Sequence, residues 1–238
     1  MRKPLIAAGA AALAVGAAGI AYAQNPAPSI TVTSSVTPTK AGTKSKPKAA
    51  TLRLKVTNDP ASKTTAAQIA ITLPSTLKLS TSGLKQCTKS DTEITNQSPQ
   101  KACKGSIAGT GTASATLNPN STTPAPLDFK LTPIVGKNEL LFYLQQTGGV
   151  TAVLHGKISG KKMTISIPGF LQQPVPGTYS ALNGLDATIK LVKGGKSLIT
   201  STGCTAKKHK IGVTISYVPN PSPPTSPTAS GSADAKCS

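Results

Sequence analysis

Residues 73–117 read LPSTLKLSTSGLKQCTKSDTEITNQSPQKACKGSIAGTGTASATL, and this stretch organises the predicted fold. A Leu-Pro pair ends a short apolar segment, a polar loop runs between Cys87 and Cys103, and a run of Gly, Ala, Ser and Thr follows. Two cysteines at the ends of one loop are the arrangement expected of a local disulfide between two strands. Glycines in the following strand indicate a bulge or a close approach of backbones. The polar residues 88–102 are interpreted only as a connection.

Outward from this stretch, much of the chain alternates between apolar and polar residues with the period of two that is typical of half-buried β-strands. The clearest segments are 52–56, 69–73, 127–131, 185–191 and 211–217. Residues 150–158 and 163–167 are predicted to form a hairpin through the turn at 159–161. Residues 139–146 form a continuous apolar run and are predicted to be a central strand buried on both faces. Residues 170–184 contain closely spaced Pro and Gly and are predicted to be a loop.

About ten short strands with turn residues between them, and no convincing amphipathic helix, predict an all-β fold. The expected architecture is an antiparallel β-sandwich, immunoglobulin-like in arrangement, over residues 48–218. Two smaller sandwiches that divide near residues 119–126 are the alternative. A Pro/Ser-rich tail is predicted over residues 219–238.

Residues 1–23 have the three parts of a secretory signal peptide, namely a basic start, an Ala/Gly-rich apolar run and an Ala-Tyr-Ala cleavage site. The apolar run is short and Gly-rich for a membrane span. We therefore expect export, with the mature chain beginning at Gln24. Residues 24–47 are rich in Pro, Ser, Thr and Lys, and their short alternating segment at 30–32 favours an edge strand over a flexible stalk.

The chain has four cysteines, all after the signal peptide. In an exported protein an even number of cysteines favours disulfides over metal ligation or catalysis. Three pairings are possible, and the one with the shortest loops joins Cys87 to Cys103 and Cys204 to Cys237. Closure of the first loop is worth about 3 kcal/mol by chain entropy. The second bond would tie the tail back to the final strand.

The formal net charge of +19 falls to +17 when Arg2 and Lys3 leave with the signal peptide. Arg53 is the one remaining arginine, and the basic surface is otherwise made of lysines dispersed along the chain. Bidentate phosphate contacts and groove reading favour Arg over Lys. With no Trp and six aromatic residues after the signal peptide, the chain lacks the residues of a base-stacking platform. These features argue against specific nucleic-acid recognition and leave salt-sensitive binding to anionic envelope polymers.

Seven motifs are spread along the chain: Leu73-Pro74, Leu77-Lys78-Leu79, the loop bounded by Cys87 and Cys103, residues 107–113 (IAGTGTA), residues 153–158 (VLHGKI), Cys204 and the terminal Lys236-Cys237-Ser238. Together they resemble the motifs of a family of uncharacterised secreted proteins from actinobacteria. The resemblance spans nearly the whole mature chain. It implies export and the two disulfides, and it implies no catalytic, cofactor or metal residues.

Residues with catalytic chemistry are sparse. The two histidines, His155 and His209, stand without a recognisable nucleophile or triad partner, so each is interpreted as a surface or strand-filling residue. Asp91 and Glu93 are the one close pair of carboxylates, but they lie on the polar loop and are expected to solvate it rather than to cleave glycosides. No catalytic residue is predicted.

Two further motifs have simpler explanations than ligand binding. Cys204 and His209 could start a metal site, but a structural zinc site needs four ligands and an oxidised cysteine cannot be one. Gly194-Gly195-Lys196-Ser197 resembles the end of a phosphate-binding loop, yet Lys190 stands where that motif requires its first glycine. A tight hairpin turn explains the two glycines. No metal or cofactor is predicted.

The sequence therefore predicts a secreted, non-enzymatic β-sandwich that acts as a structural or adhesive module of the cell envelope or exterior. The alternative is an extracellular protein that binds an anionic envelope polymer or another ligand through a Lys-rich face. An extracellular hydrolase is a third hypothesis, which the scarcity of acid and base residues disfavours.

Overall fold

The computed structural model describes residues 27–146, 148–218 and 227–238. The predicted signal peptide, residues 24–26 and residues 219–226 of the predicted tail lie outside this part of the chain. Eleven strands form the main sheet: β1 (Ile30–Thr37), β3 (Thr51–Asn58), β4 (Thr65–Thr72), β6 (Gly109–Leu117), β7 (Ala125–Val135), β8 (Glu139–Gln146), β9 (Thr151–Ser159), β10 (Lys162–Ser166), β11 (Ser180–Ile189), β15 (Lys208–Val218) and β16 (Thr228–Lys236). Short helices and small strands complete the fold: η1 (Pro60–Ser62), α1 (Asp91–Gln97), α2 (Pro99–Ala102), α3 (Gly169–Gln172), β2 (Lys48–Ala49), β5 (Leu77–Leu79), β12 (Val192–Lys193), β13 (Lys196–Ser197) and β14 (Ile199–Ser201).

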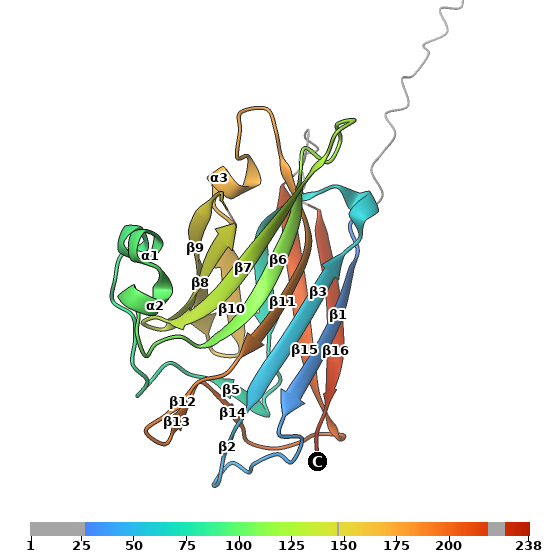
Figure 1. Cartoon of the computed structure of the whole chain (residues 1–238). Helices are drawn as coiled ribbons and strands as arrows, with labels where there is room; N and C mark the ends of the chain where they lie inside the picture. Colours follow the sequence, from blue (N-terminus) through green and yellow to red (C-terminus); the bar gives the residue numbers. More distant parts are fainter. Residues whose placement is uncertain (1–26, 147, 219–226) are drawn as a thin grey trace, which may run out of the picture.

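The main sheet is antiparallel throughout and nearly closes on itself. Its strand order is β1-β3-β11-β6-β7-β8-β9-β10-β4-β15-β16, and the two end strands lie side by side (Figure 1). An odd number of alternating strands makes β1 and β16 run in the same direction. Just beyond both strands, Ser238 donates to the carbonyl of Thr39 and accepts from the amide of Ala41, at 2.8 and 2.7 Å. The sheet thus wraps around one apolar interior.

The structure confirms the all-β class, whereas the sandwich arrangement is not confirmed. A sandwich has two sheets that face each other, but these strands follow one another in a single hydrogen-bonded order. Strands from both sides of residues 119–126 alternate in that order, with β11 between β3 and β6. The two halves of the chain therefore share one sheet and one core, which differs from the alternative of two small sandwiches.

One end of the wrapped sheet is filled. We call it the closed end, and its loops are residues 38–50, 73–108, 136–138, 160–161 and 190–207. There β2, β14 and β5 form a second, three-stranded sheet, which places the fully buried Leu198 and Ile199 and the buried Leu77 against the main core. This small sheet fills the closed end with apolar side chains.

The predicted central strand is β8, with the bounds that its apolar run predicts. Its residues at even positions, such as Phe142, belong to the interior core, while Leu141 and Tyr143 belong to a separate outer cluster. Helices α1 and α2 cover that outer cluster, and the fully buried Ile94 of α1 packs into it. Residues 88–102 are therefore more than a connection, because they form the layer that buries the second face of β8.

At both ends of the described chain, the main sheet extends beyond residues 48–218, the predicted bounds of the β-domain. The predicted tail contains β16, which pairs with β15 from Lys208↔Lys236 to Ser216↔Thr228. At the other end the predicted edge strand is confirmed, because β1 stands first in the sheet order and pairs with β3 along its whole length. Both segments are part of the sheet rather than appendages to it.

Candidate functional site

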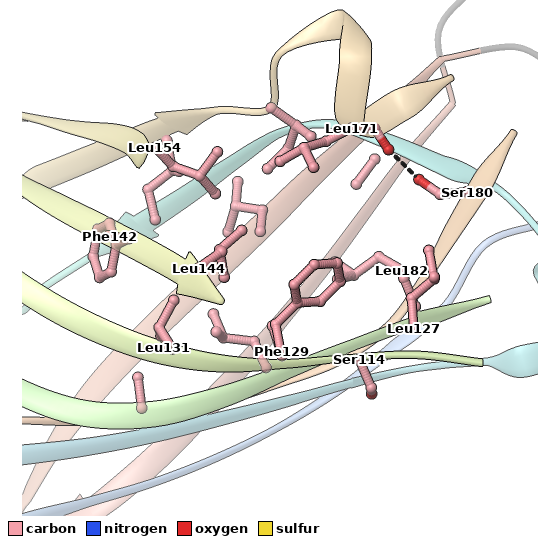
Figure 2. Close-up of a pocket in the computed structure, with 18 of the residues that line it drawn as sticks. Ser114, Leu127, Phe129, Leu131, Phe142, Leu144, Leu154, Leu171, Ser180 and Leu182 are labelled. Atoms are coloured by element: carbon pink, nitrogen blue, oxygen red, sulfur yellow. Dashed lines mark hydrogen bonds between the residues drawn. The ribbon is translucent and has the colours of Figure 1, made fainter. Parts of the chain in front are cut away.

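The interior of the wrapped sheet contains a cavity of about 300 Å³ toward the end opposite the small sheet. We call this the open end, and its described loops are residues 59–64, 118–124, 148–150 and 167–179. Leucine, isoleucine, phenylalanine and alanine side chains from β11, β6, β7, β8, β9, β10 and β4 line the cavity (Figure 2). The volume is at the lower end of the range of small-molecule sites.

Strand β6 leaves room for the cavity because its inward side chains are small. Gly111, Ala113 and Ala115 pair with larger inward residues of the two neighbouring strands, such as Phe129 of β7 and Leu185 of β11. Where two neighbours carry large side chains and the strand between them carries small ones, the side chains cannot close the gap. The small-residue run in the sequence thus becomes one wall of the cavity.

The glycines of β6 also confirm the predicted close approach of backbones. A Cβ atom on Gly109 would overlap the carbonyl oxygen of Thr188, and one on Gly111 would overlap that of Asp186. Both carbonyls belong to β11, which is the neighbour of β6 in the sheet. Glycine is therefore needed at positions 109 and 111 for pairing with β11, whereas the small side chains of Ala113 and Ala115 leave the space inside.

A β-bulge in β11 adds a second apolar side chain to the same wall. The register with β6 shifts between Leu182 and Gly184, so that Asn183 is the extra residue. Leu182 and Leu185 both line the cavity although three positions separate them, which a regular strand of period two does not allow. The Asn183 amide donates to the hydroxyl of Thr116 at 2.9 Å and holds the bulge against β6.

The rim of the open end carries exposed apolar side chains. Val150, Phe170 and Val175 are 41%, 55% and 52% exposed, and they are three of the four exposed large apolar residues in the described chain. Phe170 and Val150 also line the cavity. The apolar lining is therefore continuous with an apolar rim.

Helix α3 is fastened beside the opening. The Ser180 hydroxyl donates to the carbonyl of Leu171 (Figure 2), and the Gln172 side-chain amide donates to the carbonyl of Ile167 at 2.5 Å. These bonds hold α3 at one side of the opening. The loop predicted over residues 170–184 is shorter in the structure, because most of α3 and the first residues of β11 lie within those bounds.

A buried hydrogen-bonded chain braces the strands at the open end. The Tyr217 hydroxyl of β15 donates to Oδ1 of Asn58 in β3 at 2.6 Å, and Nδ2 of Asn58 donates to the carbonyl of Leu182 at 2.8 Å. Tyr217 is fully buried and Asn58 nearly so. Burial raises the pKa of Tyr217 to about 12, against a smaller lowering by the bond to Asn58. Three strands are thereby tied together across the interior.

Among the described residues, no ionisable group lines the cavity. Its polar residues are Ser114, Gln146 and Ser180, and all other lining side chains are apolar. The lining therefore holds no general acid, general base or cation, and what it can offer a ligand is the exclusion of water from apolar surface.

The four cysteines form the pairing expected from the shortest loops. Cys87 is bonded to Cys103 and Cys204 to Cys237. The first bond lies in the outer cluster beneath α1 and α2, and the second joins the closed end to the end of β16. Neither touches the cavity. Two disulfides point to an oxidising, non-cytoplasmic environment.

The structure brings His155 together with two carboxylates that the sequence did not connect to it. Nδ1 of His155 lies 3.0 Å from Oε2 of Glu139, and Nε2 lies 3.1 Å from Oδ2 of Asp91. Burial alone would lower the pKa of His155, but hydrogen bonds with Asp91 and Glu139 raise it overall. Both ring nitrogens face carboxylates, so no nucleophile shares this imidazole. The cluster instead joins α1 to the wall of the sheet.

Glu93 has a different partner from Asp91. Lys89 donates to Oε1 of Glu93 at 2.8 Å, while the backbone amide and hydroxyl of Ser90 bond to Oε2. The bond from Lys89, followed by those from Ser90, lowers the pKa of Glu93 to about 2. Ser90 and Glu93 together form the capping box that starts α1. The sequence signal for this helix was present in the spacing Ser90-x-x-Glu93.

The other singled-out motifs have structural roles. His209 is buried in β15 with Nδ1 2.8 Å from the Thr76 hydroxyl, and burial lowers its pKa. Gly194 and Gly195 have positive φ angles and form the turn of the β12–β13 hairpin, as the sequence predicts. Within the described residues, no three histidine, cysteine or acidic side chains are grouped as a metal site would require.

Compared with known proteins, the sequence matches no family model and no individual curated protein significantly. In the part of the chain that the structure describes, no helix has the length and hydropathy needed to cross a bilayer. The case for a function therefore depends on the cavity and on the surface of the molecule.

Proposed function

We propose that this protein is a secreted, non-enzymatic binding protein that holds an uncharged hydrocarbon molecule, or the hydrocarbon tail of a lipid, inside the wrapped sheet. The observation that carries the proposal is the apolar cavity of about 300 Å³ that opens at an apolar rim. Secretion is supported by the two disulfides and by the signal-like residues 1–23. The resemblance to exported actinobacterial proteins adds support for export and assigns no ligand.

The chemistry of the lining selects the ligand class. Each buried CH₂ group contributes about 0.8 kcal/mol of transfer free energy. A charged group drawn into the same space would lose its hydration, and no lining side chain could pair with it. The ligand is therefore neutral within the cavity, and any charged head group stays at the rim, where water reaches it.

The experiment is a fluorescence titration with N-phenyl-1-naphthylamine, a neutral apolar probe. We expect saturable binding by the wild-type chain and at least a tenfold weaker affinity for the A113L/A115L double variant, whose added side chains fill the cavity from β6. The matched control is Thr112→Leu, on the exposed face of the same strand, which should bind the probe like the wild type.

The stability of the A113L/A115L variant shows whether weaker probe binding is due to a filled cavity or to a misfolded protein. Filling a cavity commonly stabilises a protein by about 0.5–2 kcal/mol. The double variant should therefore unfold at an equal or higher urea concentration than the wild type. The proposal is wrong if the wild type does not bind the probe, or if the stably folded double variant binds it equally well.

The second candidate is the alternative that the sequence offers, an extracellular protein that binds an anionic envelope polymer through a Lys-rich face. The observation that favours it is the unequal distribution of lysines between the two ends of the sheet.

A further inference from the structure

Lysines are concentrated at the closed end. Its loops carry fifteen lysines, whereas the described loops of the open end carry one, Lys63. The open-end loops also carry one carboxylate, Asp59, so their formal charge is zero. In Figure 1 the closed end is the lower end, with the β12–β13 hairpin and the small sheet, and α3 lies at the upper end. The basic surface and the cavity opening are thus on opposite ends of the molecule.

The carboxylates near the closed end are already paired. Its loops contain two, Asp91 with His155 and Glu93 with Lys89, and the bordering Glu139 also bonds to His155. Of the five ion pairs among the described residues, one neutralises a lysine of these loops, namely Lys89. Most of this positive charge has no ion-pair partner among the described residues.

Two of these lysines converge from separate loops on one glycine. A Cβ atom built on Gly105 would lie 3.1 Å from Nζ of Lys193 and 3.9 Å from Nζ of Lys85. The two ammonium nitrogens are therefore within about 7 Å of each other. Gly105 has a φ angle of +86° and carries no side chain that could separate them. Like charges held this close favour an anion between them.

A third lysine extends the cluster along the same surface. The aliphatic part of Lys196 lies over Gly83, with Cγ 3.2 Å from the position of a Cβ on that residue. Gly83 is two positions from Lys85, and Lys196 is on the same hairpin as Lys193. Lys85, Lys193 and Lys196 are all exposed and join none of the ion pairs among the described residues.

We propose that the closed end binds a flexible polymer of closely spaced phosphate-type charges, with Lys85, Lys193 and Lys196 at the centre of its site. Lysine ammonium groups bind phosphate as point charges and do not demand the planar geometry that Arg recognises. No arginine lies in the closed-end loops, and no aromatic residue lies there for base stacking. This favours a flexible polyanion over a nucleic acid. When the protein binds the polymer in this way, its cavity opening is directed away from the polymer.

The test measures the binding of long-chain inorganic polyphosphate by isothermal titration calorimetry at several salt concentrations. The K85Q/K193Q variant is compared with K63Q/K130Q, which removes the same net charge from the open end and from the middle of β7. At about 0.1 M salt we expect at least a tenfold loss of affinity for K85Q/K193Q and less than a threefold loss for the control. The slope of log K against log salt should decrease in magnitude by about two for K85Q/K193Q, one for each phosphate contact removed.

Three outcomes would overturn the proposal. The first is an equal loss for both double variants, which would mean that total charge alone attracts the polymer. The second is no binding by the wild type at 0.15 M salt. The third is tighter binding of duplex DNA than of polyphosphate at matched phosphate concentration, which would assign the surface to nucleic acid.

This site is independent of the proposed cavity function. The A113L/A115L variant should bind polyphosphate like the wild type, and K85Q/K193Q should bind N-phenyl-1-naphthylamine like the wild type. The failure of one proposal therefore leaves the other standing.

Discussion

The two ends of the wrapped sheet differ in the side chains that fill the space between the strands and hold the strands together. At the closed end, loops long enough to form a second sheet place Leu77, Leu198 and Ile199 against the core. At the open end the described connections form no such sheet, and polar bonds such as Tyr217–Asn58 brace the strands while the space between them stays empty. The difference indicates that apolar packing is concentrated at one end, whereas the proposed ligand would enter at the other.

The largest effect is expected from removing the disulfide that joins the closed end to the end of β16. Cys204 and Cys237 are 33 positions apart, and by chain entropy their bond is worth about 4 kcal/mol. We expect C204S/C237S to lower the free energy of unfolding in urea by this amount and to speed amide exchange in β16. The C87S/C103S variant, with 16 positions between its cysteines, should lose about 3 kcal/mol and leave exchange in β16 unchanged. A larger loss for C87S/C103S would mean that the outer layer of α1 and α2 contributes more to stability than the link between Cys204 and the end of β16.

A smaller effect is expected at the open end from Tyr217→Phe. This change leaves the buried Oδ1 of Asn58 without its donor, which costs about 1–2 kcal/mol at neutral pH. Urea unfolding measures the loss, and hydrogen exchange should place it at the ends of β3 and β15. Unchanged stability would mean that the bond does not brace the opening.

The alkaline pH dependence tests the same brace. The phenol ionises near pH 10 in the unfolded chain and near pH 12 when folded, so its contribution is complete below pH 10 and is lost as the pH rises through 12. The free energy of unfolding of the wild type should fall between about pH 10 and pH 12, and the Tyr217→Phe variant should lack this part of the fall. Tyr179→Phe, which removes a half-buried phenol at the open end, is the control and should keep it.

The smallest effect is expected on the wall of the sheet, at His155 of β9, which bonds to Asp91 of α1. Its folded pKa is raised, so its bonds to Asp91 and Glu139 stabilise the protein fully below about pH 6.5 and are lost as the pH rises through the folded value. Because the side chain is 43% exposed, His155→Gln should cost less than about 1 kcal/mol. In the His155→Gln variant, amide hydrogen exchange in α1 should be faster than in the wild type below pH 6.5. At higher pH the two proteins should exchange at similar rates.

The matched control for His155→Gln is Arg53→Gln, which breaks the exposed pair with Asp186 on another wall of the sheet. It should leave exchange in α1 unchanged. If His155→Gln also leaves it unchanged at pH 5.5, the imidazole does not hold the helix.

Local patterns predicted the strands more successfully than their arrangement. The alternation of Leu52, Leu54 and Val56 and the continuous run of β8 identified strands that the structure confirms. Helix α1 was missed because its one inward residue, Ile94, gives no periodic signal, although its capping box was readable. Strand β16 was missed because small residues such as Ala229, Gly231 and Ala235 resemble linker composition when their partner strand is unknown.

The sequence alone determined the excess of lysines, predicted the all-β class and favoured one disulfide pairing of three, because alternation, cysteine spacing and charge are properties of the chain itself. Only the tertiary structure decided that one sheet wraps around one interior. The cavity depends on which side chains face Ala113 and Ala115 across neighbouring strands, and the basic cluster depends on loops from distant positions that meet at Gly105. Volume and charge density are set by distances in space, and strand register and loop packing fix those distances.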